Sequence, residues 1–131
     1  MKIVIAGSRG FEDYTFMKNF LDNVIQIDAD TEIVSGAARG ADRLGERYAR
    51  ENKLECSQFP ADWNKYGKSA GYRRNTEMAE YADGAIVFWD GESHGSIHEF
   101  NENKRLGKPC LLVNYVNGQI VENNGFEFFE D

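Results

Sequence analysis

The sequence predicts an α/β sandwich in which helices cover both faces of a mainly parallel sheet of about five strands, followed by a short C-terminal hairpin. Two observations support this prediction. Short apolar runs with the length of buried strands alternate along the chain with segments of helical periodicity. Several of the apolar runs end in segments rich in Gly and polar residues, which is typical of strands that turn into a following helix.

Four of the predicted strands are short apolar runs, as expected for a sheet that is covered on both faces: residues 2–6, 32–35, 84–89 and 110–113. A further strand is expected at residues 54–59, where apolar and polar residues alternate. A hairpin is expected at residues 115–121, because Asn117 and Gly118 form a common two-residue turn signal. Cys56 and Cys110 lie within predicted strands and lack C-x-x-C spacing, so we expect two buried free thiols.

The predicted helices are residues 14–27, 40–52, 72–81 and 96–106. The first has apolar residues at the spacing of one helical face: Met17, Phe20, Leu21 and Val24. The second has apolar residues along one face at Ala41, Leu44, Tyr48 and Ala49. In the third, Met78 and Tyr81 are expected to point inward, and Gly107 and Pro109 end the fourth. Residues 61–71 lack a clear period and predict a long functional loop or a short helix.

The alternation of strands and helices implies right-handed crossovers and therefore a Rossmann-like three-layer sandwich. The 131 residues fit one domain, which we expect to consist of a core at about residues 2–113 and an extension at about residues 114–131. In such a sheet, ligands bind beyond the carboxyl ends of the strands, where the strand order reverses. The loops after the first, second and fourth strands are therefore expected to meet at one edge.

The composition is that of a compact globular protein, with 41% hydrophobic and 28% charged residues and with 9 Phe, 6 Tyr and 2 Trp. The net charge of -7 disfavours nucleic acid and anionic membranes as partners, but allows a small anion to bind in a local positive pocket. Candidate residues for such a pocket are Arg9, Arg39, Arg43, Arg73 and Arg74. We expect a cytoplasmic protein, because the sequence has no signal-peptide pattern and no apolar run of the roughly 20 residues that span a bilayer.

Residues 33–49 (IVSGAARGADRLGERYA) combine the end of a strand, a loop of small residues and an amphipathic helix. This arrangement directs backbone N–H groups and the positive end of a helix at an anion, so we expect a phosphate-binding loop. The residues expected to form it are Ser35, Gly36, Ala37, Arg39, Gly40 and Asp42. Arg39 could hold phosphate oxygens bidentately, or it could pair with Asp42 or another acid at the surface. The small residues could also serve only a sharp strand-to-helix turn.

Several ordered motifs are similar to those of a known superfamily. Three of them resemble sequences of the LOG-type phosphoribohydrolases, proteins once described as lysine decarboxylases: RNTEM at 74–78, ADGAIVF at 82–88 and GSIHE at 95–99. Three further motifs make the chain most similar to the YspA/YpsA-like branch of the SLOG superfamily: GSRGF at 7–11, SGAARGAD at 35–42 and FPADW at 59–63. The resemblance covers about residues 2–113.

The resemblance implies a nucleotide or nucleotide-derived ligand. In the LOG-type hydrolases, the residues that match Arg74 and Glu99 act on the N-glycosidic bond between a base and ribose 5-phosphate. A carboxylate there can stabilise an oxocarbenium ion or activate water, and an arginine can hold phosphate or orient that carboxylate. Residues 91–93 (GES) stand where the hydrolase pattern has Pro-Gly-Gly, which adds a negative charge beside the expected phosphate. Glu99 could instead be a solvated acid in the first turn of a helix.

The other candidate ligand-binding residues come from the same motifs and their neighbours: Gly7, Ser8, Arg9, Trp63, Arg73, Asn75, Gly95 and Ser96. Four aromatic residues near the expected cleft could stack on a base, although residues of this kind also serve as packing: Trp63, which is the strongest candidate, Tyr66, Tyr72 and Trp89. His94 and His98 are four residues apart, but His94 is expected to precede the helix and the sequence suggests no third ligand. No metal and no cofactor are therefore predicted.

These observations favour a protein that binds a small-molecule nucleotide and could hydrolyse the N-glycosidic bond of a nucleoside monophosphate. The alternative is a non-catalytic sensor or sequestering protein for a nucleotide signal such as an ADP-ribose derivative or a cyclic nucleotide. Nucleic-acid binding is a third hypothesis, disfavoured by the net charge. We expect a homo-oligomer, because LOG-like proteins build sites at dimer contacts and the aromatic tail at residues 126–129 needs a surface to cover.

Overall fold

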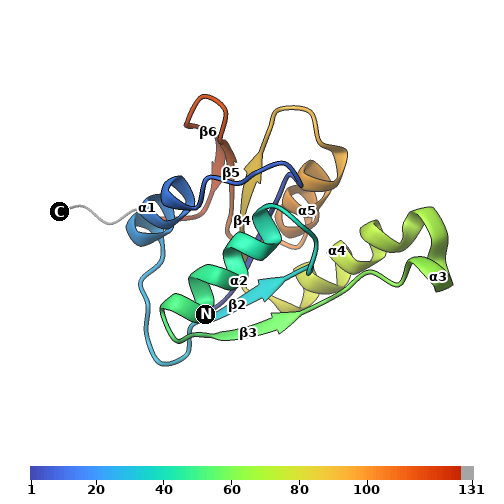
Figure 1. Ribbon diagram of the computed structural model, residues 1–131, viewed down its shortest axis with the longest axis horizontal. Helices are drawn as coiled ribbons and strands as arrows, with labels where there is room; N and C mark the ends of the chain where they lie inside the picture. Colours follow the sequence, from blue (N-terminus) through green and yellow to red (C-terminus); the bar gives the residue numbers. More distant parts are fainter. Residues whose placement is uncertain (128–131) are drawn as a thin grey trace.

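The computed structural model describes residues 1–127 and contains a six-stranded sheet in the order β3-β2-β1-β4-β5-β6 (Figure 1). The strands are β1 (Lys2–Gly7), β2 (Glu32–Ser35), β3 (Glu55–Gln58), β4 (Gly84–Trp89), β5 (Cys110–Asn114) and β6 (Gln119–Asn124). The helices are α1 (Tyr14–Val24), α2 (Ala41–Glu51), α3 (Trp63–Tyr66), the 3-10 turn η1 (Gly67–Ser69), α4 (Ala70–Tyr81) and α5 (His94–Arg105). Strands β1 to β5 are parallel and β6 pairs antiparallel with β5, which confirms the predicted α/β class with its mainly parallel sheet and C-terminal hairpin.

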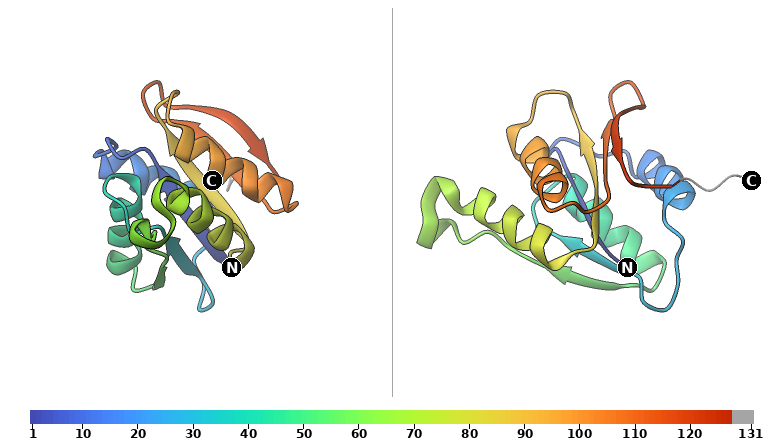
Figure 2. Two further views of the ribbon diagram at one scale, coloured as in Figure 1. Left: turned by 90° about the vertical axis from the view of Figure 1, so that its right-hand side faces the viewer. Right: turned by 180° about the vertical axis from the view of Figure 1, so that it is seen from behind.

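Helices cover both faces of the sheet because the central strands are apolar on both (Figure 2). Helices α1 and α2 pack on the face that carries Ile3 and Ile5 of β1. Helices α4 and α5 pack on the opposite face, which carries Val4 and Ala6. The side chains of β1 thus enter two apolar clusters in alternation, as the period of a strand requires.

The strand order reverses between β1 and β4, because the chain goes from β1 to β2 and β3 on one side and then returns to β4 on the other. The two strands are in register from Ile3 opposite Gly84 to Gly7 opposite Phe88. Ser8 N donates to Phe88 O at 2.9 Å, and a Cβ atom on Gly7 would overlap the same oxygen. The loops after β1 and β4 are therefore held against each other at the carboxyl edge of the sheet.

Three helix boundaries differ from the prediction by two residues or more. Helix α1 ends at Val24 because Ile25 adopts an extended conformation and places its side chain in the core. Helix α4 begins at Ala70, two residues before the predicted start. Helix α5 begins at His94, so Gly95 and Ser96 lie in its first turn and not in a preceding loop. Residues 61–71 contain α3 and η1, in agreement with the short-helix alternative.

Two predictions about side-chain burial are wrong, and both concern residues at the margin of the sheet. Tyr81 is exposed; its hydroxyl donates to Glu32, and the ammonium group of Lys2 lies over its ring. Cys56 is exposed because β3 is an edge strand with little cover, whereas Cys110 is buried in β5 as predicted.

The C-terminal aromatic tail is described only in part. Phe126 packs, partly buried, against the apolar cluster on the α1 side of the sheet. Phe128 and Phe129 lie outside the described residues, so the homo-oligomer expected from this tail stays a prediction. None of the helices within residues 1–127 is long and apolar enough to cross a membrane.

Candidate functional site

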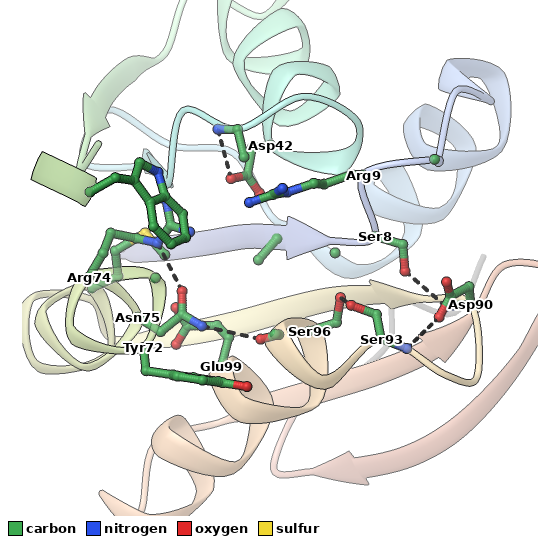
Figure 3. Close-up of a pocket in the computed structure, with 18 of the residues that line it drawn as sticks. Ser8, Arg9, Asp42, Tyr72, Arg74, Asn75, Asp90, Ser93, Ser96 and Glu99 are labelled. Carbon is green, nitrogen blue, oxygen red and sulfur yellow. Dashed lines mark hydrogen bonds between the residues drawn. The ribbon is translucent and has the colours of Figure 1, made fainter. Parts of the chain in front are cut away.

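A cavity of about 470 Å³ lies at the carboxyl edge of the sheet, where the strand order reverses (Figure 3). Its wall combines the loops after β1 and β4, the loop between β2 and α2, the beginning of α5, and the segment from α3 to α4. Ten residues that were candidates from the sequence line it: Gly7, Ser8, Arg9, Asp42, Trp63, Arg74, Asn75, Gly95, Ser96 and Glu99.

The N-terminus of α5 faces this cavity through Ser93, Gly95 and Ser96. Ser93 is the N-cap residue, but its side chain makes no capping hydrogen bond, and the first turn contains no acidic residue. Its hydroxyl instead accepts a hydrogen bond from Ser96 Oγ at 3.2 Å, while Trp89 Nε1 donates to Ser93 O at 3.0 Å. The first N–H groups of α5 therefore have no acceptor among the described residues, and the positive end of the helix is open to an anion.

Glu99 lies one turn further along α5 and is only 1% exposed. In the amide orientation that its surroundings require, Asn103 Nδ2 donates to Glu99 Oε2 at 2.8 Å. Glu99 Oε1 has no hydrogen-bond partner within the part of the chain that the structure describes. Burial raises the pKa of Glu99 well above its ordinary value, and Arg74 opposes this rise only in part. The protonated carboxyl group, which can donate a hydrogen bond to a ligand, is therefore favoured.

Asp42, in the first turn of α2, is the second buried carboxyl group of the cavity and is 5% exposed. Its Oδ2 accepts a hydrogen bond from Ala38 N at 3.1 Å. Burial raises the pKa of Asp42 to about 6, and the Ala38 hydrogen bond and the charge of Arg74 limit the rise. Arg74 is fixed in turn, because Nη1 donates to Gly36 O and Nε donates to Asn75 Oδ1 at 2.9 Å. Its charge acts on both buried carboxyl groups.

Six of the residues predicted to bind the ligand lie outside the cavity wall: Ser35, Gly36, Ala37, Arg39, Gly40 and Arg73. Arg43, which was a candidate for the positive pocket, also lies outside the wall and pairs with Glu46. Ser35 is fully buried, and its hydroxyl donates to Glu46 Oε2 at 2.6 Å and accepts from Ala37 N at 3.0 Å. Ala38 N likewise donates to Asp42 Oδ2. Two backbone N–H groups of this loop, those of Ala37 and Ala38, are therefore hydrogen-bonded to side chains of the protein itself. This arrangement differs from the open phosphate-binding loop that the sequence suggested.

The other three, Gly40, Arg39 and Arg73, differ from one another in their contacts and exposure. Gly40 has φ +81° and begins α2 against the backbone of the loop after β1, where a Cβ atom would overlap Ser8 O. Arg39 is exposed and pairs with no acid among residues 1–127, so the suggested pair with Asp42 does not form. The guanidinium group of Arg73 stacks over Tyr66 at 4.5 Å from the ring centroid.

Eight lining residues were not among the candidates: Ala6, Gly10, Ala38, Lys68, Gly71, Met78, Asp90 and Ser93. A further lining residue, Tyr72, was expected only as one of four aromatic residues near the cleft. Asp90 Oδ1 accepts from the backbone N–H groups of Glu92 and Ser93, and Asp90 N donates to Ser8 Oγ at 3.1 Å. Burial raises the pKa of Asp90, but these hydrogen bonds outweigh it and keep the pKa below its ordinary value. Asp90 and Ser93 could have been identified, because they belong to the loop after β4 that the sequence places at this edge.

Two exposed aromatic side chains flank the cavity: Trp63 is 49% and Tyr72 is 45% exposed. Trp63 lies over Gly71, where a Cβ atom would come within 3.2 Å of the indole, and the guanidinium carbon of Arg9 is 6.0 Å from the indole ring. Tyr72 contacts His98 edge-on, with 4.5 Å between the ring centroids. Both aromatic faces can therefore be reached by a planar group that enters from solvent.

The two histidines lie within α5, so the expectation that His94 precedes the helix is wrong. His98 Nδ1 is 3.2 Å from Asn75 Nδ2, and its Nε2 is 3.5 Å from Glu102 Oε1. Burial lowers the pKa of His98, and Glu102 opposes this. Across residues 1–127, no three His, Cys, Asp or Glu side chains form a group that could hold a metal ion.

Comparison with known proteins assigns the family. Residues 1–66 match the family model described as "YspA, cpYpsA-related SLOG family". The chain belongs to this family. It is also 33% identical over 117 residues to the Gene 61 protein of Mycobacterium phage D29, a match that covers 84% of this chain and 94% of that protein. The match to the family model ends before Arg74 and α5, so these parts of the cavity wall rest on the structure itself.

The fold is similar to that in the X-ray structure of DNA processing protein A (DprA) from Streptococcus pneumoniae, with a TM-score of 0.71 and 19% sequence identity. The match covers 92% of this chain and 52% of the other, so this chain spans about half the length of the solved one. At this identity the likeness is one of fold.

Proposed function

We propose that the protein binds a nucleotide or nucleotide-derived ligand in this cavity. The observation that carries the proposal is the open N-terminus of α5 beside a buried carboxyl group with an unpartnered oxygen. Glu99 follows Gly95 and Ser96 by about one turn, a rise of ~5.4 Å, which suits a ligand that carries a phosphate close to a sugar. Trp63 and Tyr72 offer aromatic faces to a base.

The same groups could cleave the N-glycosidic bond, in which the base leaves with a proton and water adds to the anomeric carbon of the ribose. Glu99, with its raised pKa, can donate a proton to the leaving base. Asp42, whose pKa is about 6, is largely ionised at neutral pH and can stabilise a developing oxocarbenium ion. Arg74 Nη2 has no acceptor within the described residues and is available to a ligand oxygen.

Calorimetry with AMP tests binding, and chromatography of the same mixtures for free adenine tests hydrolysis. If the protein is a hydrolase, Glu99→Gln should reduce adenine release by about 10²-fold or more, because Gln keeps the shape but loses the transferable proton, while AMP affinity changes only a few-fold. Glu51→Gln is the matched control, because it makes the same change at the far end of α2, outside the cavity wall, and Glu51 is not among the charges that act on Glu99.

The alternative is a non-catalytic sensor, and the acidic residue Glu92, in the loop that leads into α5, favours it. Tight binding of AMP or cyclic AMP, with the ligand recovered intact after denaturation of the protein, would support the sensor and reject the hydrolase. If AMP, cyclic AMP and ADP-ribose all fail to bind, the proposal of a nucleotide site is wrong.

A further inference from the structure

Two helix N-termini reach the cavity from opposite layers of the sandwich. Helix α2 lies on one face of the sheet and begins after Gly40, and α5 lies on the other face and begins after Ser93 (Figures 1 and 3). Their first turns differ in charge, because α2 has Asp42 there and α5 has no acidic residue. Both helix ends are positive, so an anion with two charged groups could in principle engage both.

At the N-terminus of α2, a carboxyl group of the protein itself, that of Asp42, already lies in the first turn. Asp42 is 95% buried, lines the cavity and accepts the Ala38 N–H group at 3.1 Å, and Ser35 Oγ accepts the Ala37 N–H group at 3.0 Å. An incoming phosphate would find these two donors occupied and would approach a carboxylate. Repulsion between like charges in a partly desolvated site outweighs the weak attraction of the helix end.

The position of the Asp42 carboxyl group is fixed by its neighbours. Gly36 lies so close that a Cβ atom there would be 2.7 Å from Asp42 Oδ2 and 2.6 Å from Arg74 Nη1. Arg74 closes the arrangement by donating to Gly36 O. The carboxyl group is thus enclosed by Gly36, Ala38 and Arg74, and a ligand cannot readily displace it.

From this geometry we propose that Asp42 determines specificity: it occupies the N-terminus of α2 and restricts the cavity to ligands with one phosphate group, which binds at α5. The inference rests on the proposed nucleotide site and deepens it. Nucleoside monophosphates and cyclic nucleotides fit this rule. Ligands that contain a diphosphate, such as ADP and ADP-ribose, place a second charged group against Asp42.

The test compares the Kd values of AMP and ADP, which differ by one phosphate, at pH 7.5 or above by calorimetry. The wild-type protein should bind AMP about tenfold or more tightly than ADP. Asp42→Asn keeps the acceptor for Ala38 N and removes the charge, so the ratio of ADP to AMP affinity should rise about tenfold. Asp42→Ser provides a second variant with a short acceptor, and thermal unfolding verifies that each variant is folded.

Glu51→Gln is the matched control, because it removes one negative charge from the far end of the same helix, outside the cavity wall. Its ratio of ADP to AMP affinity should equal that of the wild type. The inference is overturned if wild-type protein binds ADP as tightly as AMP, or if folded Asp42→Asn retains the wild-type ratio while AMP binds both proteins. Failure of the wild type to bind AMP, ADP or any other nucleotide overturns the proposed function itself, and the specificity rule with it.

Discussion

Two buried carboxyl groups in one cavity, Asp42 and Glu99, both feel the charge of Arg74, but burial raises their pKa values to different extents. Asp42 keeps the Ala38 N–H group and the attraction of Arg74, so burial raises its pKa only to about 6. Glu99 has one amide donor, from Asn103, and burial raises its pKa well above the ordinary value. Such a difference between two acids is what assigns separate acid and base roles in many hydrolases.

The pKa of Asp42 makes the stability of the fold depend on pH. A group whose pKa is higher in the folded than in the unfolded state stabilises the fold below the unfolded value, and this stabilisation is lost as pH rises through the folded value. For Asp42 the window runs from the ordinary pKa of 3.8 to about 6. Relative to Asp42→Asn, the wild-type protein should therefore lose up to about 3 kcal/mol between about pH 4 and about pH 8, as measured by urea unfolding.

Asp28→Asn provides a control with the opposite sign. The backbone N–H group of Asp30 lowers the pKa of Asp28, so its stabilisation is present above the ordinary pKa and is lost as pH falls. The two variants should therefore diverge from the wild type in opposite directions. A difference between wild type and Asp42→Asn that stays constant with pH would contradict the burial of an ionisable carboxyl group at this position.

At the scale of elements, α2 is positioned on the sheet by a glycine. Gly45 lies in the middle of α2, and a Cβ atom there would be 2.8 Å from the Cβ and Cγ2 atoms of Ile5 in the central strand β1. Ile5 is fully buried, and its Cβ atom cannot move without moving the strand. Close contact between helix and strand here also sets the distance from Asp42 to the loop after β1.

Gly45→Ala should therefore destabilise the protein even though Ala favours a helix by about 1 kcal/mol. Overpacking of a rigid core contact costs about 1–3 kcal/mol, so we expect a net loss of up to about 2 kcal/mol in urea unfolding. Gly95→Ala makes the same change in α5, where a Cβ atom meets nothing within 4 Å, and should leave stability equal or slightly higher. Equal effects of the two substitutions would show that helix propensity, and not the contact with Ile5, decides the outcome.

The buried strands could be predicted from sequence because their signal is local: β2 and β4 are short apolar runs whose limits match the structure. The ends of helices could not, because distant contacts decide them. Helix α5 starts two residues before the predicted position, because Asp90 Oδ1 accepts the N–H group of Ser93 and Trp89 Nε1 donates to Ser93 O. Ile25 continues the apolar pattern of α1 but leaves the helix to fill the core.

The candidate site, too, could be predicted from the sequence only in part. Residues that follow β1 and β4, such as Ser8 in its loop and Ser96 in the first turn of α5, could be placed at the cavity because topology alone brings the ends of these two strands together. For the loop after β2, the motif predicted donors for an external anion. The sequence could not show that the Asp42 side chain, in the first turn of α2, would accept a hydrogen bond from Ala38 N, or that Ser35 Oγ would accept one from Ala37 N. Those contacts depend on the depth at which α2 packs.

At the scale of the whole molecule, a net charge of -7 surrounds a cavity that we propose binds an anion. The attraction comes from groups at contact range: the open N-terminus of α5 and the lining residues Arg9, Lys68 and Arg74. The repulsion comes from acidic residues spread over the surface, and it acts through solvent, where salt screens it over about 8 Å at physiological ionic strength. The two effects should therefore respond differently to salt.

Between about 50 and 200 mM salt, the affinity for AMP should stay within about threefold, and any change should be toward tighter binding, because screening weakens the long-range repulsion more than the contacts inside the cavity. A protein that binds nucleic acid through many phosphates instead loses about 10³-fold or more over this range. Calorimetry with AMP and gel shifts with single- and double-stranded DNA, at the same salt concentrations, measure both. We expect no DNA complex at any of them, because a long polyanion would lie across the acidic surface. A DNA complex that forms at low salt and dissociates steeply as salt rises would contradict this prediction and favour a polyanion as the ligand at this edge of the sheet.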